Sequence, residues 1–174
     1  MKMNNIILTG FMGTGKTTVS KCLKCVFGLE VLDTDTEIER REGRTIPEIF
    51  EAEGEEYFRE RETELLRELR AKENIVISCG GGTVLRTCNV ELLKESGTVF
   101  LLSATPETIF ERVKNSHHRP LLEQNKSVEG IRALLEQRNS RYQAAADVIV
   151  SIEGKTTEQI CREILKRRGY RNVK

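Results

Sequence analysis

Short apolar runs rich in β-branched residues recur along the chain, each about the length of one β-strand. Their positions are residues 6–8, 29–32, 75–77, 99–102 and 148–152. Helical patterns fill most of the gaps between these runs. Alternation of this kind predicts parallel strands joined by crossover helices. We therefore expect an α/β fold with a five-stranded, open parallel sheet that binds its ligands at the carboxyl ends of the strands.

The starts of two helices are legible in the sequence. Residues 45–48, TIPE, form a capping box with a proline just inside the helix, and Thr156 with Gln159 repeats the box before the last helix. The charged stretch 51–72 keeps three apolar side chains at helical spacing, so it is predicted to be a surface helix with one buried stripe. Those side chains are Phe58, Leu65 and Leu69.

The segment after the first apolar run, GFMGTGKT at residues 10–17, matches the pattern G-x-x-x-x-G-K-[ST] at every fixed position. Its glycines allow backbone angles that other residues avoid, so the N–H groups of residues 13–18 can converge on one anion. Lys16 would reach the β- and γ-phosphates, and the Thr17 hydroxyl suits a bridging magnesium ion. The loop therefore predicts nucleotide binding by Gly13, Thr14, Gly15, Lys16, Thr17 and Thr18.

A helix is expected directly after this loop. Val19, Leu23 and Val26 recur at the i, i+4 and i+7 spacing of one apolar stripe. Strand, glycine-rich loop and helix, in that order, form the context in which this pattern binds phosphate. The alternative, a glycine-rich turn that matches by chance, is disfavoured by the context.

Length, charge and cysteine content narrow the class of protein. At 174 residues the chain suits a single domain, 1–174, and its 28 basic and 27 acidic side chains nearly cancel, which gives no reason to expect a nucleic acid or a membrane as partner. No apolar stretch approaches the roughly 20 residues of a membrane span. The five scattered cysteines are unlike a secreted disulfide framework. We expect a cytoplasmic monomer that acts on small molecules.

The second apolar run ends in LDTDT, where Asp33 and Asp35 are two residues apart. Side chains at i and i+2 of a strand point to the same side, so both carboxylates would face one site, next to the phosphate loop if this strand neighbours the first. Asp33 could then hold magnesium, and Asp35 could take the proton of an attacking hydroxyl. A helix cap and a turn residue are the structural alternative for the two aspartates.

Glycines and arginines supply the remaining signals for an acceptor site. The glycine triplet, residues 80–82, follows the third apolar run and would let a ligand approach the backbone closely. Arg138 shares a helical face with apolar side chains, where an unpaired guanidinium is costly, so we expect it to meet an anion. Arg59 lies three residues before Glu62, which can orient it. The two arginines could grip a ligand carboxylate, with solvated helix arginines as the alternative.

The stretch 115–127 has little periodicity and is predicted to be a mobile loop between two helical segments. Arg119 in this loop could swing over a phosphoryl group during its transfer and stabilise its charge. The same movement would shut out water, which would otherwise compete as the acceptor.

The segments GFMGTGKT, DTD, FRERE, CGGG, RPLL and RNSRY, in this order, resemble the shikimate kinase family over nearly the whole chain. The resemblance implies a three-layer P-loop NTPase fold of the nucleoside-monophosphate-kinase type, with substrate-binding helices at about residues 34–62 and a mobile lid at about 113–127. It also implies transfer of the ATP γ-phosphate to the 3-hydroxyl of shikimate, a step in making chorismate and the aromatic amino acids.

The resemblance also implies roles for individual residues of this sequence. The catalytic group would be Asp35 as base, Lys16, and Arg119 as the lid cation. Besides the phosphate loop and Arg119, the ATP contacts would include Arg112 and Lys155 near adenine, and the magnesium partners would be Thr17 and Asp33. Shikimate would be bound by Asp35, Arg59, Arg138, Gly80, Gly81, Gly82, Phe50 and Phe58.

Two departures from the family pattern and two alternative functions accompany this interpretation. Cys79 stands where threonine is common before the glycines, and the segment around Lys155 lacks a proline that is common near the adenine loop.

One alternative function is a kinase of another polyol acid such as gluconate, which the glycine triplet and Arg59 disfavour. The other is a nucleotide-binding regulator without activity, which Lys16, Arg119 and the two aspartates disfavour.

Overall fold

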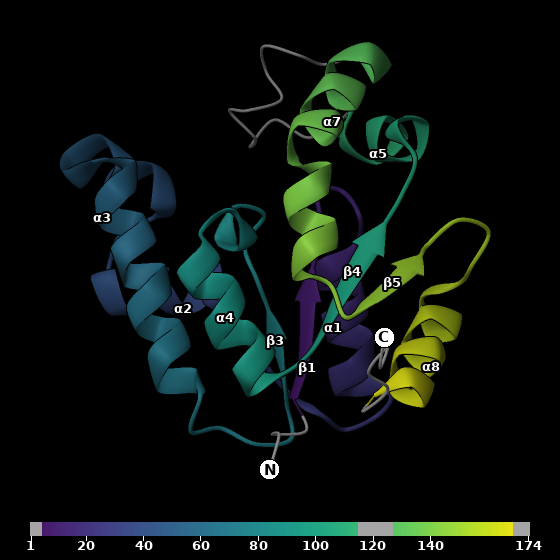
Figure 1. The fold of residues 1–174 in the computed structure, drawn as a ribbon, viewed down its shortest axis with the longest axis horizontal. Helices are drawn as coiled ribbons and strands as arrows, with labels where there is room; N and C mark the ends of the chain where they lie inside the picture. The colour runs from purple at the N-terminus through teal and green to yellow at the C-terminus, as the bar shows by residue number, and fades with distance from the viewer. Residues whose placement is uncertain (1–4, 115–126, 169–174) are drawn as a thin grey trace.

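The computed structural model of the chain describes residues 5–114 and 127–168. Its strands form one parallel sheet in the order β2-β3-β1-β4-β5 (Figure 1). They are β1 (Asn5–Thr9), β2 (Glu30–Asp33), β3 (Ile75–Ser78), β4 (Gly97–Ser103) and β5 (Val148–Ser151). The predicted five-stranded parallel sheet is confirmed. Because β3 lies between β1 and β2, the second strand of the chain does not neighbour the first.

Helices cover both faces of the sheet and give the expected three layers. Figure 1 shows α4 and α7 over one face and α1 over the other. The helices are α1 (Lys16–Cys25), α2 (Thr34–Glu42), α3 (Ile46–Leu69), α4 (Thr87–Ser96), α5 (Pro106–Val113), α7 (Val128–Ala145) and α8 (Thr157–Arg167), with a 3-10 turn, η1 (Thr83–Leu85). Within residues 5–114 and 127–168, none of the helices combines the length and apolar character that crossing a bilayer requires.

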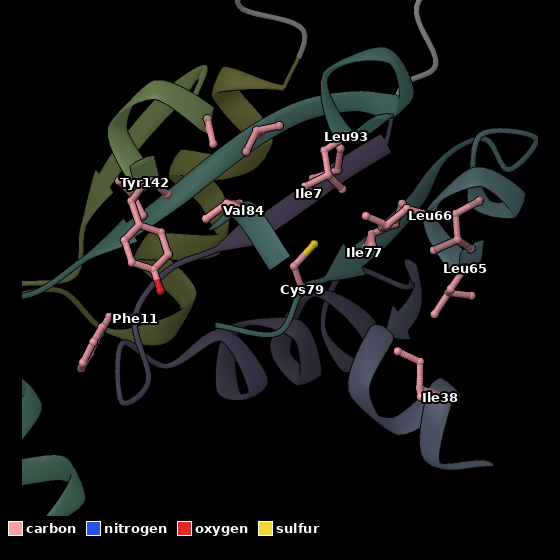
Figure 2. Close-up of a cluster of buried hydrophobic side chains, with 14 of the residues drawn as sticks. Ile7, Phe11, Ile38, Leu65, Leu66, Ile77, Cys79, Val84, Leu93 and Tyr142 are labelled. Carbon is pink, nitrogen blue, oxygen red and sulfur yellow. The ribbon is translucent and has the colours of Figure 1, made fainter. Parts of the chain in front are cut away.

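The central strands are buried on both faces, which explains their continuous apolar sequences. Ile7 points into a cluster formed with α3, α4 and α7, whereas Ile6 and Leu8 point into a second cluster formed with α1 and α8. Figure 2 shows the first cluster, in which Tyr142 and Leu93 pack beside the sheet. The two core clusters hold the sheet between the helices. Because all of its strands are parallel, their carboxyl ends lie at the same end of the sheet.

The ends of the helices largely agree with the sequence patterns. Thr45 and Thr156 both form the predicted capping boxes. Helix α3 begins earlier than the charged stretch and is broken at Gly54, where φ is 85° and ψ is 167°. The buried stripe predicted for this helix is present. The prediction for Val26 is wrong: α1 ends one residue before it, so its side chain leaves the apolar face and is 59% exposed.

Asn5, fully buried at the start of β1, joins three neighbouring segments of the chain. Its Nδ2 donates to the carbonyl oxygens of Lys72 at 2.8 Å and Ser96 at 3.0 Å. Its Oδ1 accepts from the N–H of Ile75 at 3.0 Å. These bonds satisfy buried backbone groups at the points where the chain enters β3 and β4. One side chain thus connects the three central strands at their amino ends, which lie opposite the phosphate loop.

We expect Asn5→Ala to lower the free energy of unfolding by about 3 kcal/mol, because three buried backbone groups would lose their partner. Urea denaturation followed by circular dichroism measures the loss. Asn139→Ala, at an exposed position of α7, is a matched control that should change stability by less than about 0.5 kcal/mol. Equal stability of the two variants would contradict the anchoring role of Asn5.

Candidate active site

The loop between β1 and α1 has the geometry of a phosphate cradle. Gly10, Gly13 and Gly15 adopt φ values of 148°, 81° and 95°, a region that favours glycine. Gly15 is the N-cap of α1, so the N–H groups of the loop stand at the positive end of this helix. Lys16 Nζ donates to the carbonyl oxygens of Gly10 at 2.6 Å and Phe11 at 3.2 Å, which holds the ammonium group over the loop.

The two residues predicted to contact adenine lie in different surroundings. Arg112, near the end of α5, donates to the carbonyl oxygen of Gly13 at 3.4 Å, so its guanidinium borders the phosphate loop. Lys155 forms an ion pair with Glu163 of α8 at 2.6 Å. The structure therefore brings Arg112 to the nucleotide loop and engages Lys155 with α8.

Thr17 and Asp33, the predicted magnesium partners, line one groove of about 590 Å³ between α1 and β2. Asp33 ends β2 and caps α2, where its Oδ1 accepts the N–H of Thr36 at 3.1 Å. No cluster of three acidic, histidine or cysteine side chains suited to a metal occurs in the described part of the chain. A hydroxyl with a carboxylate nevertheless fits Mg²⁺, which takes most of its remaining ligands from water and phosphate.

Asp35 lies in the first turn of α2 and not on the strand, because β2 ends at Asp33. The prediction that strand alternation points both aspartates to one side is therefore wrong. Asp35 still reaches the carboxyl end of the sheet, since α2 begins there. Its Oδ1 is buried and has no hydrogen-bond partner among residues 5–114 and 127–168. A buried carboxyl oxygen without a partner is costly, which is typical of a group that meets a ligand.

Several charges surround this carboxyl group. Burial raises the pKa of Asp35 from 3.8 to about 7. Repulsion from Glu62 and Asp33 adds to the shift, whereas the positive charges of Lys16 and Arg59 oppose it. A carboxyl group with a pKa near 7 can both accept and release a proton at neutral pH, as a general base requires.

The glycine triplet leaves room for two charged side chains. A Cβ atom on Gly80 would stand 2.5 Å from Asp35 Oδ1, and one on Gly82 would stand 2.4 Å from Arg59 Nη2. The N–H of Gly80 donates to Thr34 Oγ1 at 3.1 Å, which ties the triplet to α2. The sequence alone suggested close approach of a ligand. The structure adds that the absent side chains make space for Asp35 and Arg59.

Arg59 is held between two carboxylates of α3. Its Nη1 lies 2.6 Å from Glu62, and its Nη2 lies 3.0 Å from Glu55. The predicted orientation of Arg59 by Glu62 is therefore confirmed. The guanidinium also stacks over Phe58, with its carbon 5.2 Å from the ring centroid. Phe50 meets Phe58 edge-on, with 5.2 Å between the ring centroids, so one partly exposed and one buried ring lie beside this cation.

Arg138 approaches the same region from α7. Its guanidinium lies close enough to the hydroxyl of Tyr142 to influence the pKa of that group, and the hydroxyl donates to the carbonyl oxygen of Gly81 at 2.5 Å. Burial raises the pKa of Tyr142, and the positive charges of Arg138 and Arg59 oppose that shift. Sequence reasoning missed Tyr142 as a site residue, because its place on an apolar helix face indicates only a core position.

The structure thus gathers most of the predicted site at the carboxyl ends of the strands. Lys16, Asp35 and Arg59 lie close enough to share one electrostatic environment, and Tyr142 links Arg138 to the glycine triplet. Arg119 and almost all of the predicted lid, 113–127, lie outside the described residues. Their role stays a prediction.

Comparison with known proteins agrees with the motifs and geometry of this site. The family model described as shikimate kinase matches residues 12–168. The chain belongs to the shikimate kinase family. Members of this family use ATP, in keeping with the phosphate loop. The curated shikimate kinase of Persephonella marina is 44% identical over 165 residues, or 95% of this chain and 99% of that protein. The one from Pelotomaculum thermopropionicum is 50% identical over 143 residues, covering 82% and 83% of the two chains.

Solved structures of shikimate kinases have the same architecture. The enzyme of Acinetobacter baumannii in complex with shikimate superposes with a TM-score of 0.86 at 38% identity, covering 98% of this chain and 95% of that one. Shikimate kinase from Aquifex aeolicus gives 0.79 at 40% identity, with 93% and 94% covered. A gluconokinase from Sinorhizobium meliloti gives 0.59 at 17% identity over 97% and 94% of the chains, which shows a shared fold alone.

We expect Gly82→Ala to weaken binding of the acceptor in this family's reaction by about tenfold, because the new methyl group would displace the Arg59 guanidinium. Alanine tolerates the backbone angles of Gly82, φ −96° and ψ −8°, so the fold should persist. The KM for the acceptor measures the effect. At Gly81 a Cβ would meet its nearest atom at 3.8 Å, so Gly81→Ala should have a smaller effect. The reverse order of the two variants would contradict this account.

Proposed function

We propose that this chain transfers the γ-phosphate of ATP to the 3-hydroxyl of shikimate, giving shikimate 3-phosphate and ADP. The observation that carries the proposal is the Asp35 carboxyl beside Lys16 and Arg59, whose Oδ1 is buried and has no hydrogen-bond partner in the described part of the chain. Membership of the shikimate kinase family supports the choice of acceptor. The reaction belongs to the biosynthesis of chorismate and the aromatic amino acids.

The acceptor acid is bound through its charge, its hydroxyl groups and its ring. Arg59 and Arg138 form charge-assisted hydrogen bonds to the carboxylate. The backbone of the glycine triplet, residues 80–82, borders Arg59 at Gly82 and contributes further contacts. Phe50 and Phe58 provide an apolar wall for the ring.

Asp35 receives the hydroxyl proton during the transfer. The 3-oxygen of the acceptor forms a bond to the γ-phosphorus, and the bond from that phosphorus to the β,γ-bridging oxygen breaks, which releases ADP. Lys16 and the N–H groups of the phosphate loop, from Gly13 to Thr18, stabilise the negative charge on the phosphates. Burial favours the neutral carboxylic acid that this proton transfer produces.

Thr17 and Asp33 fit a magnesium ion, since both line one groove beside the phosphate loop and offer oxygen ligands. When bound, Mg²⁺ would neutralise charge on the β- and γ-phosphates. Arg112 lies where it can contact the nucleotide, and Lys155 remains the second proposed adenine contact. Arg119 is proposed as the cation that closes over the transferred group and excludes water.

The proposal includes a cytoplasmic monomer. All five cysteines are free, which is typical of proteins in a reducing compartment.

An acceptor-selectivity assay tests the proposed function. ADP release is followed by a coupled assay with shikimate, quinate, gluconate and water offered in turn as acceptors. We expect shikimate to support turnover far above the other three. Gluconate and water have no ring for the aromatic wall, and quinate carries an additional hydroxyl on a saturated carbon where the carboxylate is attached, which changes the angle at which the carboxylate meets the two arginines. Preferred turnover of gluconate would identify a different polyol-acid kinase. Tight ATP binding without turnover for any acceptor would instead indicate a regulator.

We expect Asp35→Asn to abolish turnover, because the amide cannot take the proton, and to leave ATP binding close to that of the wild type. The substitution should also change the pH dependence of stability. The Asp35 pKa is raised from 3.8 to about 7 on folding, so this group's contribution is present below about pH 4 and is lost as the pH rises to about 7.

Denaturation of the ligand-free protein in urea, at about pH 4.5 and about pH 8, measures this contribution. The wild type should lose stability between the lower and the higher pH because Asp35 ionises, whereas asparagine does not ionise. The free energy of unfolding of the Asp35→Asn variant, minus that of the wild type, should therefore be larger at the higher pH. A stability difference that is the same at both pH values would contradict the raised pKa. Full activity of the variant would contradict the role of Asp35 as base.

A further inference from the structure

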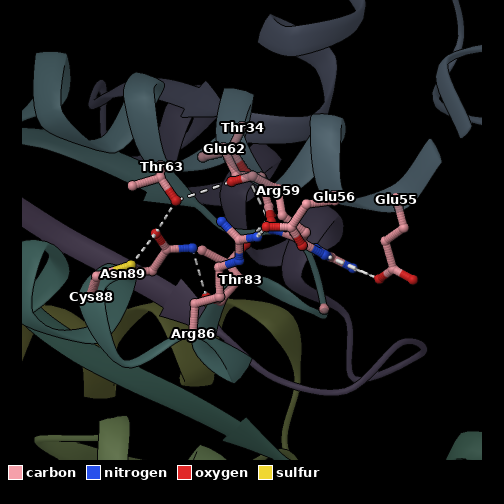
Figure 3. A network of polar contacts seen from close by, with 12 residues as sticks. Thr34, Glu55, Glu56, Arg59, Glu62, Thr63, Thr83, Arg86, Cys88 and Asn89 are labelled. Carbon is pink, nitrogen blue, oxygen red and sulfur yellow. Dashed lines mark hydrogen bonds and ion pairs between the residues drawn. The ribbon is translucent and has the colours of Figure 1, made fainter. Parts of the chain in front are cut away.

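Behind Arg59 lies a network of buried polar side chains that the proposed chemistry does not use directly. Glu62 is 1% exposed, Thr83 and Asn89 are fully buried, and Thr63 is 5% exposed. Figure 3 shows these side chains pointing toward one another from α3, η1 and α4. Buried polar groups are expensive unless they are satisfied, so the network has a specific structural task.

Both oxygens of the Glu62 carboxylate are engaged. Oε2 lies 2.6 Å from Arg59 Nη1, and Oε1 accepts a hydrogen bond from Thr83 Oγ1 at 2.6 Å. The Thr83 hydroxyl therefore fixes the rotation of the carboxylate that holds the guanidinium. Hydrogen bonds to a charged group are roughly twice as strong as those between neutral groups, so this contact is a firm one.

Thr83 is itself fixed by the rest of the network. Its carbonyl oxygen accepts from Asn89 Nδ2 at 3.0 Å, and Asn89 Oδ1 accepts from Thr63 Oγ1 at 2.7 Å. Thr63 Oγ1 also lies 3.0 Å from the carbonyl oxygen of Arg59, one turn earlier on α3. The network thus forms a closed connection from the backbone of Arg59, through α4 and η1, to its guanidinium.

Arg59 needs this support because it has an alternative partner. Its Nη2 and Nε also contact Glu55, whose side chain is 65% exposed to solvent. If Glu62 turned away, Arg59 would follow Glu55 toward the surface and leave the space beside Gly82. The segment that carries the triplet continues directly into Thr83, so the same residue positions the glycines and the arginine.

We propose that Thr83 is a positioning residue of the acceptor site: its hydroxyl orients Glu62, which holds the Arg59 guanidinium against the glycine triplet for a carboxylate ligand. The proposal rests on the proposed function, because the carboxylate is that of the acceptor. Thr83 does not touch the reacting atoms. Its effect therefore falls on acceptor affinity and not on nucleotide binding.

Two pairs of side chains at Thr83 isolate the donor and test the proposal. Thr83→Val keeps the shape of threonine without a donor, and Thr83→Ser and Thr83→Cys, which both lack the methyl group, differ from each other in a strong against a weak donor. We expect the KM for shikimate to rise in the order Ser, Cys, Val, with about a tenfold increase for valine, while the KM for ATP changes by less than about twofold. Calorimetric titration of shikimate without ATP should show the same order.

Thr98→Val is a matched control, because Thr98 is a buried threonine near the amino end of β4, opposite the site. It should leave both KM values unchanged. If Thr83→Val does not fold, the comparison of serine with cysteine still decides the question. Equal shikimate affinity for these two variants, or a matching loss of ATP affinity, would overturn the positioning role. A wild-type protein that does not phosphorylate shikimate would instead overturn the proposed function.

Discussion

The site depends on charges placed where water cannot screen them. Burial and the nearby Glu62 and Asp33 force Asp35 toward its neutral form, and the positive charges of Lys16 and Arg59 counteract this. Removing either cation would leave acidic groups facing one another in a medium of low polarity. The carboxyl end of β3 follows from this constraint: Glu62 is paired with Arg59 and Asp33 caps α2, whereas Asp35 Oδ1 has no hydrogen-bond partner among the described residues. The glycines between them leave the backbone bare.

The sequence predicted the fold well because its signals are local and agree with one another. Continuous apolar runs identified the strands, and capping residues such as Thr45 identified helix starts. Strand order was not predictable in the same way. Nothing in the residues of β2 says that β3 inserts between it and β1, since that choice depends on contacts between distant segments. The prediction for Val26 was wrong although its signal is local: its spacing fits the apolar face of α1, but the helix ends one residue before it.

Candidate site residues were easier to identify than the reasons for their positions. Asp35 was chosen through strand alternation, yet it is presented by the first turn of a helix. The glycines were recognised as a close approach, but which side chains fill the space depends on three elements meeting. Tyr142 and Thr83 carry no signal in one sequence, because a buried tyrosine or threonine has the same pattern in any core. Only coordinates show which partners their hydroxyls have.

The break in α3 at Gly54 has a geometric consequence for the two aromatic rings. Phe50 and Phe58 are eight residues apart. In a straight helix they would be separated by about 12 Å along the axis, given a rise of about 1.5 Å per residue. Their ring centroids are only 5.2 Å apart, because the non-helical angles at Gly54 fold the first part of the helix back. The width of this apolar wall is therefore set by a bend in the main chain, so adaptation to a flatter or bulkier ring could proceed through hinge angle and leave both phenylalanines in place.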